Sequence, residues 1–402
     1  MERLPSQLKH HDNAESDKAP RPDHDSCREP NHFAGQGIQN SGHLAAGRDV
    51  NIIHNGNVLQ LREGEDDRER RERERQDRER QDEHRKTIFD TLKFDQMGAR
   101  QKNIEQAHFQ TCSWILQDQA YREWLRDDIS RDVGYFLWIK GKPGAGKSTM
   151  MKFLLNQAEK QTQRKQRQST TISFFFNARG NDMEKGTLGL YRSLLVQLLQ
   201  LYPHLKSVLD GYPKGTQWNV ESVRGLFGDT VRLLFDETKT VKDVDRAPVV
   251  CFIDALDECE EQQVRDMIAH LSGLCNFGNR LHVCFASRHY PHITTRKGSS
   301  IILEDRQGHQ QNIASYIDST LYINEENCLG RIRSDLQKKA SGVFMWVVLV
   351  VKILNKECDA GRGLEFQLRQ RLAEIPADLH TLFQNILTRD TTNAPNLLLC
   401  VQ

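Results

Sequence analysis

The sequence predicts an α/β protein, in which a parallel sheet flanked by helices is followed by an all-helical region and preceded by a charged extension. Strand-like and helix-like segments alternate from residue 135 onward. Two near-continuous apolar runs, APVVCFIDAL (247–256) and RLHVCFASR (280–288), have the pattern of strands buried on both faces, which is typical of a parallel sheet. Beyond about residue 305 the strand pattern fades and helical spacing dominates.

Length and composition set broad limits on what the chain can be. Its 402 residues are enough for two or three domains, and its net charge of +1 gives no overall attraction to nucleic acid or acidic lipid. The nine cysteines include no CxxC pair, so we expect free thiols in a reducing cytosol, with Cys251 and Cys284 in the core. No signal peptide is visible, and the most apolar run (342–354) is too short for a bilayer, so a buried helix is expected there.

The first 86 residues differ from the rest in composition. Residues 1–60 are predicted to be disordered, and within them the Gly/Asn-rich stretch 35–58 leaves two alternatives open. It is either a segment that stacks in register with identical chains, as in an amyloid-type signalling motif, or a flexible leader with one short β-turn. Residues 61–86 are nearly pure Arg, Glu and Asp at helical spacing without an apolar seam, which predicts a solvated helical spacer.

From Thr87 the chain is predicted to be globular. Residues 87–134 have helical apolar spacing and form a lead-in to the sheet domain, which spans 135–304. Within that domain we expect strands at 135–140, 170–178, 247–256 and 280–288, a helix starting at Lys147, and an amphipathic helix at 190–202. Residues 305–402 should form a helical domain and an incomplete winged-helix region, with helices in HQQNIASYIDSTLY and IRSDLQKKASGVFMWVVLVVKIL.

The stretch LWIKGKPGAGKSTM (137–150) carries the clearest chemical signal. It fits G-x-x-x-x-G-K-[ST], and it leaves a strand and enters a helix, as a phosphate-binding P-loop does. Backbone N–H groups of such a loop approach phosphates closely, and the helix N-terminus adds its positive dipole end. Lys147 should reach the β- and γ-phosphates, and the Ser148 hydroxyl should bind Mg²⁺. The predicted nucleotide-binding residues are Gly141, Gly144, Ala145, Gly146, Lys147, Ser148 and Thr149.

A second strand end supplies the acids that a P-loop needs. In VVCFIDALDEC, Asp254 follows five apolar residues and is predicted to hold Mg²⁺. Asp257 and Glu258 come just past the strand, near the predicted γ-phosphate; the alternative is that they are ordinary loop acids. Oligomeric AAA-type motors place a glutamate directly after the strand aspartate, whereas Ala255 stands here. A catalytic base would therefore come from Asp257 or Glu258, and slow hydrolysis is expected.

A third strand end provides a cation. Arg288 ends HVCFASR and can sense the γ-phosphate; the alternative is a surface arginine that pairs with a nearby acid. Arg179, after the second strand, is a weaker candidate of the same kind. No [NT]-K-x-D pattern for reading guanine is present, since TKTV (238–241) fails at its last position, so ATP is expected over GTP.

GKPGAGKST, FIDALDEC and FASRHYP, in this order, resemble the NACHT class of signal-transducing (STAND, NLR-like) P-loop NTPases. FDQMGARQKNIEQAHFQTCSWIL is similar to the lead-in of filamentous fungal members of the nephrocystin-3-like N-terminal type, and IPADLHTLFQNIL to their helical region. The resemblance covers about residues 90–402. It implies ATP/ADP or GTP held by the loop, Mg²⁺ on Asp254, Arg288 as a sensor, and extra acids at Asp257 and Glu258.

The resemblance also implies a role: nucleotide-gated self-oligomerisation in heterokaryon incompatibility or programmed cell death. It makes residues 35–58 similar to the N-terminal amyloid-type motifs of fungal receptors, which implies a homotypic N-terminal partner. Members usually carry a full winged-helix domain and C-terminal repeats, whereas no repeat is visible here and the sequence stops at NLLLCVQ. We expect a cytoplasmic switch without DNA-specific binding or a transmembrane segment. The alternatives are a turnover ATPase and a scaffold with a structural nucleotide site.

Overall fold

The computed structural model describes residues 51–54, 57–60, 63–108, 111–126, 134–164, 169–236, 247–276, 280–290, 298–322 and 326–389. It divides into two compact units, residues 1–76 and 77–402. The segment 1–34, predicted to be disordered, lies outside the described residues, as does most of the Gly/Asn-rich stretch 35–58.

In the first unit, β1 (Asn51–His54) and β2 (Asn57–Gln60) pair as an antiparallel hairpin in which Asn51 lies opposite Gln60. This arrangement covers the end of the Gly/Asn-rich stretch and leaves both alternatives for it open. Helix α1 (Glu63–Leu92) follows.

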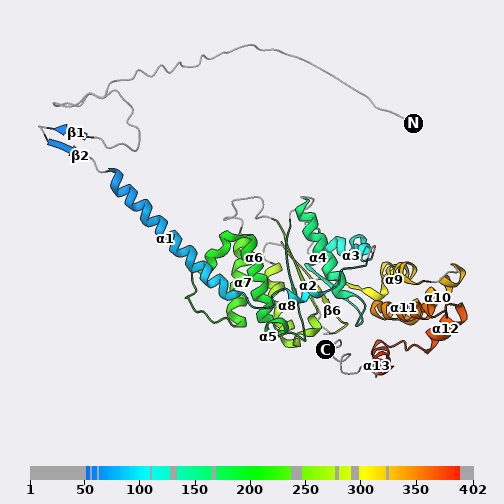
Figure 1. The fold of residues 1–402 in the computed structure, drawn as a ribbon. Helices are drawn as coiled ribbons and strands as arrows, with labels where there is room; N and C mark the ends of the chain where they lie inside the picture. The colour runs from blue at the N-terminus through cyan, green and yellow to red at the C-terminus, as the bar shows by residue number, and fades with distance from the viewer. Residues whose placement is uncertain are drawn as a thin grey trace, which may run out of the picture. The chain divides into compact units, whose positions relative to one another are not determined.

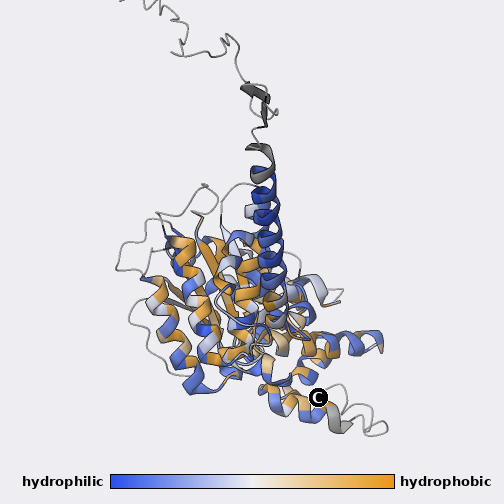
Figure 2. Ribbon diagram, turned by 90° about the vertical axis from the view of Figure 1, so that its left-hand side faces the viewer, coloured by the Kyte–Doolittle hydropathy of each residue, from blue (hydrophilic) through white to orange (hydrophobic). Residues whose placement is uncertain are grey.

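The charged run does form a helix, but α1 does not end with it at residue 86. Exposed i,i+4 pairs such as Arg73–Glu69, with 3.3 Å between Nη2 and Oε2, lie along its polar part. Its last turns place Ile88, Phe89 and Leu92 on one face, where all three are buried in the core of the second unit. Apolar spacing therefore extends the helix from the charged segment into the globular part. In Figure 2 the polar part of α1 is the most uniformly hydrophilic helix in view.

The second unit is built on a parallel sheet of five strands in the order β4-β5-β6-β3-β7 (Figure 1). Four strands confirm the sequence prediction: β3 (Phe136–Lys140), β4 (Thr170–Phe175), β5 (Val249–Asp254) and β6 (Leu281–Ser287). The fifth, β7 (Ser299–Ile302), pairs with β3 at the sheet edge and was not predicted. Strand β3 lies between β6 and β7, so the loop after it opens inside the sheet rather than at an edge.

Helices cover both faces of the sheet. One core joins α6 (Thr187–Leu201), α7 (Val220–Phe235) and α8 (Glu261–Cys275) to one face, and a second core joins α3 (Gln119–Trp124) and α4 (Lys147–Gln163) to the other. Cys251 and Cys284 are fully buried in strands, as predicted. The α/β fold class is therefore confirmed: a parallel sheet with flanking helices and a P-loop between β3 and α4.

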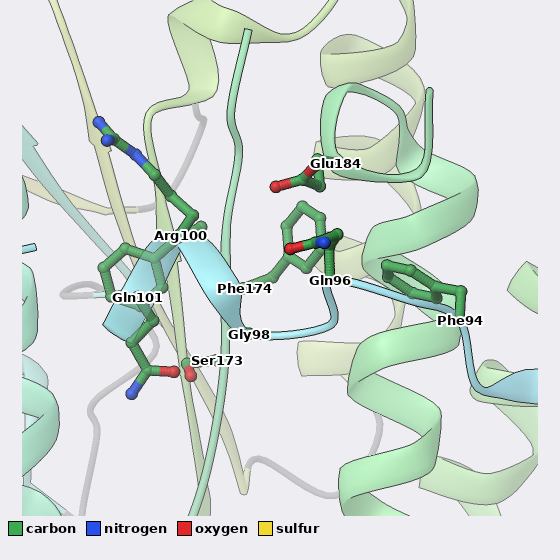
Figure 3. Close-up of a pocket in the computed structure, with 9 residues that line it drawn as sticks. Phe94, Gln96, Gly98, Arg100, Gln101, Ser173, Phe174 and Glu184 are labelled. Atoms are coloured by element: carbon green, nitrogen blue, oxygen red, sulfur yellow. The ribbon is translucent and has the colours of Figure 1, made fainter. Parts of the chain in front are cut away.

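The lead-in packs against the sheet domain both before and after a tight turn that joins α1 to the next helix. The guanidinium of Arg192 in α6 donates to the carbonyl oxygens of Thr91, Leu92 and Lys93 at 2.7 to 2.8 Å, which fixes the end of α1. The chain then turns through Gln96 and Gly98, both with positive φ, into α2 (Ala99–Asn103). Figure 3 shows this turn beside Phe174 of β4 and Glu184 of α5 (Asp182–Lys185). The cavity there holds only about 20 Å³, room for about one water.

A helical region follows β7 and has its own core. Its helices are α9 (Gln307–Thr320), α10 (Glu326–Ala340), α11 (Phe344–Asp359), α12 (Glu365–Glu374) and α13 (Leu379–Arg389). The apolar run 342–354 lies in α11 from Phe344 onward, and this helix is largely buried, as predicted, with Trp346 and Val350 fully enclosed and Met345 exposed. Ser341 and Gly342 have positive φ and separate α10 from α11. Among the described residues, no helix has the length and apolarity to cross a membrane.

Candidate nucleotide-binding site

The glycine-rich loop lies at the carboxyl end of β3 and opens α4. Gly146 is the residue before the helix and has φ 97°, and Gly144 has φ 74°, so both occupy the left-handed region that favours glycine. The helix begins at Lys147, as predicted, with Ser148 and Thr149 in its first turn. Residues 144–149 all line one cavity, so the structure brings six of the seven predicted nucleotide-binding residues to one wall, and Gly141 is not among the residues that line it.

Lys147 is directed back into the loop. Its Nζ donates to the carbonyl oxygens of Gly141 and Lys142, both at 2.9 Å. Burial lowers the pKa of the Lys147 ammonium, while the negative charges of Asp257 and Asp254 oppose that shift. The ammonium therefore lies inside the bend of the loop, which a phosphate chain would occupy, and it is held there by neutral acceptors that a phosphate oxygen can replace.

Asp254 ends β5 next to the loop. It is only 1% exposed, and burial raises the pKa of its carboxyl to about 6, against the opposing effects of Ser148 and Lys147. Neither carboxylate oxygen has a hydrogen-bond partner among the described residues. An unpartnered buried carboxylate beside a serine hydroxyl fits Mg²⁺, which takes one or two protein oxygens and completes its shell with phosphate oxygens and water. Asp254 and Ser148 are the residues that would hold it.

The segment after Asp254 turns sharply. Ala255 has φ 59° and ψ 47°, in the left-handed region, and a short 3-10 turn, Leu256–Glu258, follows. Asp257 is directed towards β6, where its Oδ1 accepts the backbone N–H of Arg288 at 2.9 Å. Glu258 is directed away towards the segment after β4, where its Oε2 accepts the backbone N–H of Ala178 at 2.6 Å. The two predicted catalytic acids thus have different partners.

Arg288 lies beside Asp257, as the alternative to a sensor role anticipated. Its Nε is 2.9 Å from Oδ2 of Asp257, and its Nη1 donates to the Tyr290 hydroxyl at 3.1 Å. Arg288 also lines a second cavity of about 1050 Å³ together with Lys142 and Arg179. The structure therefore places both arginines that the sequence singled out on the wall of one cavity that reaches the loop at Gly144.

The cavity on the α4 side of the loop has a volume of about 750 Å³ and an apolar far wall that sequence motifs did not reveal. His108 of the lead-in packs edge-on against Tyr316 of α9, with ring centroids 5.1 Å apart, and Tyr316 packs against Phe344 of α11 at 5.2 Å. These rings come from three distant segments, and no local spacing connects them. A wall of this kind has the size and apolarity that a purine base requires.

Glu304, just after β7, is a second residue that the sequence did not indicate. Its Oε1 is hydrogen-bonded to Nε2 of His289, with 2.5 Å between the two atoms. Its buried Oε2 has no hydrogen-bond partner among the described residues. A Cβ built on Gly141 would lie 3.0 Å from that oxygen, so Gly141 is needed for this close approach as well as for the loop. Glu304 is therefore an acid at the base of the phosphate loop.

The helical region contacts the loop directly. The backbone N–H of Met345 donates to the Gly144 carbonyl oxygen at 2.9 Å, and Lys142 Nζ donates to the Ser341 carbonyl oxygen at 3.0 Å. A Cβ on Gly144 would lie 2.9 Å from Cδ2 of Leu379 in α13. The start of α11 and the start of α13 therefore both pack on the residues that would surround a phosphate.

Comparison with known proteins agrees with the predicted resemblance. Residues 110–288 match the family described as Nephrocystin 3, N-terminal. The chain is also 25% identical, over 297 residues, to Vegetative incompatibility protein HET-E-1 of Podospora anserina, a match that covers 68% of this chain and 20% of that protein. The chain spans about a fifth of the length of that relative. Both matches agree with the resemblance to fungal NACHT-class proteins that the sequence predicts.

Solved structures show distant likeness. A structure of Drosophila ORC bound to DNA superposes with a TM-score of 0.43 and 12% identity, covering 72% of this chain and 65% of the other. The Aeropyrum pernix ORC2 protein, in ADPNP–ADP complexes, gives a TM-score of 0.38 at 12% identity, covering 70% and 72%.

Proposed function

We propose that this protein is a nucleotide-binding switch of the NACHT class, which binds ATP or ADP with Mg²⁺ and self-associates in the ATP-bound form. The incompatibility function in the name of its Podospora relative suggests the setting, fungal incompatibility signalling or programmed cell death. We propose that the protein acts in the cytoplasm. The N-terminal stretch 35–58 would be the segment through which associated chains recruit identical segments.

One observation carries the proposal: the buried, unpartnered carboxylate of Asp254 faces the residues that begin α4. The loop amides and Lys147 supply positive groups for phosphates, and Asp254 with Ser148 supplies oxygens for a cation. A phosphate chain and Mg²⁺ bound together would satisfy both sets of groups. The aromatic wall of His108, Tyr316 and Phe344 offers stacking to a base, and we propose ATP over GTP because no guanine-reading motif is present.

The contacts of the helical region support a switch rather than a simple store of nucleotide. Met345 and Leu379 touch Gly144, so a ligand that reshapes the loop also moves the starts of α11 and α13. A ligand shifts a conformational equilibrium only through contacts that differ between the two states. The γ-phosphate is the group by which ATP and ADP differ, and Arg288 and Arg179 line the cavity on that side of the loop.

Light scattering of the purified chain tests the proposal directly. The protein is measured alone, with ADP, with ATP and with a non-hydrolysable ATP analogue, each with Mg²⁺. A switch gives larger particles with ATP and the analogue than with ADP. An equal particle size in all four conditions contradicts nucleotide-gated association and favours a structural nucleotide site.

A turnover ATPase is the second candidate, and the partners of the acids argue against it. Asp257 is paired with Arg288, and Glu258 accepts the backbone N–H of Ala178, so each predicted base has a contact that competes with holding an attacking water. A steady turnover near 1 s⁻¹ or faster would favour the enzyme over the switch.

A further inference from the structure

Arg100 lies where the two cavities beside the loop meet. It belongs to α2 in the lead-in, yet it lines both the cavity that contains Lys147 and Ser148 and the cavity that contains Arg179 and Arg288. Figure 3 shows its side chain leaving α2 on the side away from Phe94 and Glu184. The lead-in therefore presents a cation to the space around the phosphate loop, although α2 lies well before the loop in the sequence.

One nitrogen of the Arg100 guanidinium lacks an acceptor. Its Nε is buried and has no hydrogen-bond partner among the described residues, whereas Lys147 is bonded to loop carbonyls and Arg288 to Asp257. Burying a guanidinium N–H without an acceptor is costly, and an anion bound nearby removes that cost.

Asp254 is a buried group of opposite charge that also lacks hydrogen-bond partners. Its two carboxylate oxygens are both buried and have no hydrogen-bond partner among the described residues. A cation and a carboxylate that both have unpartnered atoms beside the phosphate loop suit a ligand that carries both signs, and a phosphate with its Mg²⁺ is such a ligand.

We propose that Arg100 binds the terminal phosphate of a nucleoside triphosphate, so that the lead-in forms part of the sensor. This rests on the proposed nucleotide-binding function. The loop amides and Lys147 hold the inner phosphates, so an arginine outside the loop, on the side of Asp254 and Arg288, meets the γ-phosphate.

Few residues separate the proposed contact of Arg100 with the phosphate from the end of α1. Arg100 follows the turn at Gln96 and Gly98, and that turn follows the end of α1, which Arg192 holds through three carbonyl oxygens. A triphosphate that draws Arg100 towards the loop pulls on this turn, and a diphosphate does not. The end of α1 would thereby respond to the nucleotide state.

The test compares affinities for ADP and for a non-hydrolysable ATP analogue, both with Mg²⁺, in the full chain. Arg100→Ala should lower the affinity for the analogue about tenfold or more, because charge-assisted hydrogen bonds are lost, and should change the affinity for ADP less than about threefold. Arg100→Lys, which keeps the charge without the fork of donors, should restore part of the difference. Lys102→Ala, an exposed cation of the same helix, is the matched control and should change neither.

An unchanged ratio of the two affinities in Arg100→Ala overturns the assignment. If that variant is poorly folded by circular dichroism, Arg100→Gln provides the same comparison. The outcome is separable from the proposed function: nucleotide binding that is lost in Lys147→Ala but keeps its ATP preference in Arg100→Ala rejects only the role of Arg100. Binding unaffected by Lys147→Ala rejects the site itself.

Discussion

The guanidinium of Arg288 is paired with the carboxylate of Asp257, with 2.9 Å between Nε and Oδ2, while the same carboxylate accepts the Arg288 backbone N–H at 2.9 Å. The side chain of Asp257 is 6% exposed and that of Arg288 is 42% exposed. The carboxylate of Asp257 is thus buried, whereas the guanidinium of Arg288 is accessible to solvent and to a ligand. In the proposed ATP-bound form the γ-phosphate would compete with Asp257 for the charge of Arg288, so we expect Asp257 to oppose that form.

Asp257→Asn should therefore raise the affinity for a non-hydrolysable ATP analogue relative to ADP. The asparagine oxygen still accepts the backbone N–H of Arg288, but the charge that holds the guanidinium is gone. Because the arginine is partly exposed, the pair is worth about 0.2–1 kcal/mol, which corresponds to a shift in the affinity ratio of up to about fivefold. Titration with fluorescent nucleotides measures the ratio.

Asp266→Asn is the control for that experiment, since Asp266 is an exposed acid of α8 away from the loop. A ratio that moves towards ADP in Asp257→Asn would show that Asp257 supports the triphosphate instead of opposing it.

Lys147→Ala should remove most nucleotide affinity. The substitution deletes the ammonium that lies inside the loop, and with it charge-assisted hydrogen bonds worth about 1.5–3 kcal/mol. The loss should be similar for ADP and ATP if Lys147 contacts the β-phosphate most strongly. Lys160→Ala, an exposed lysine near the end of the same helix, is the matched control. Wild-type affinity in Lys147→Ala would place the nucleotide elsewhere.

Much of the sheet was predictable because its signals are local. The runs that became β5 and β6 are apolar throughout, and the loop before Lys147 has a spacing that few other structures share. Strand β7 was missed because only Ser299–Ile302 form it, at the sheet edge, where the burial alternates and no long apolar run is needed. The change of composition at residue 86 separates the predicted spacer from the predicted helical lead-in, whereas α1 is one continuous helix across it, because the helical spacing of Ile88 and Leu92 continues the pattern.

The candidate site could be predicted in its loop and in its strand ends. Asp254 ends β5, Asp257 comes shortly after it and Arg288 follows β6, so the parallel sheet brings them to the same edge. The pairing of Arg288 with Asp257 could be named only as an alternative, because side-chain direction is not encoded in the spacing. Arg100, Glu304 and the rings of His108 and Tyr316 come from segments joined only by the tertiary fold.

Asp254→Asn should stabilise the nucleotide-free protein at pH 7.5 by roughly 1–3 kcal/mol, because it removes a buried, unpartnered negative charge. The same substitution should abolish the further stabilisation that Mg²⁺ adds to nucleotide. Thermal unfolding of the variant and of wild type, with and without MgADP, measures both effects. Destabilisation of the nucleotide-free variant would mean that the carboxylate is satisfied in solution.

The gain from Asp254→Asn should depend on pH with a definite sign. Burial raises the pKa of Asp254 from 3.8 to about 6, so the folded state favours the neutral carboxyl. That contribution to stability is fully present below about pH 3.8 and is lost as the pH rises through about 6. The difference in unfolding free energy between variant and wild type should therefore be smallest below about pH 3.8, rise between about pH 3.8 and 6, and reach its maximum above about pH 7. A difference that is constant with pH would contradict the raised pKa.

Gly144→Ala should release the helical region from the loop. A Cβ at this position meets Leu379 Cδ2 at 2.9 Å and Met345 Cβ at 3.1 Å, in addition to the strain of φ 74°. Gly146→Ala is the matched control, because it imposes similar strain at φ 97° with nothing within 4 Å of the new Cβ. Both variants should be less stable than wild type by about 1–2 kcal/mol because of backbone strain. Hydrogen exchange in α11 and α13 of the nucleotide-free protein should increase only in Gly144→Ala.

If the helical region holds the switch closed, Gly144→Ala should also associate without ATP. Equal exchange in the two variants would show that the contacts of Leu379 and Met345 do not couple the helices to the loop.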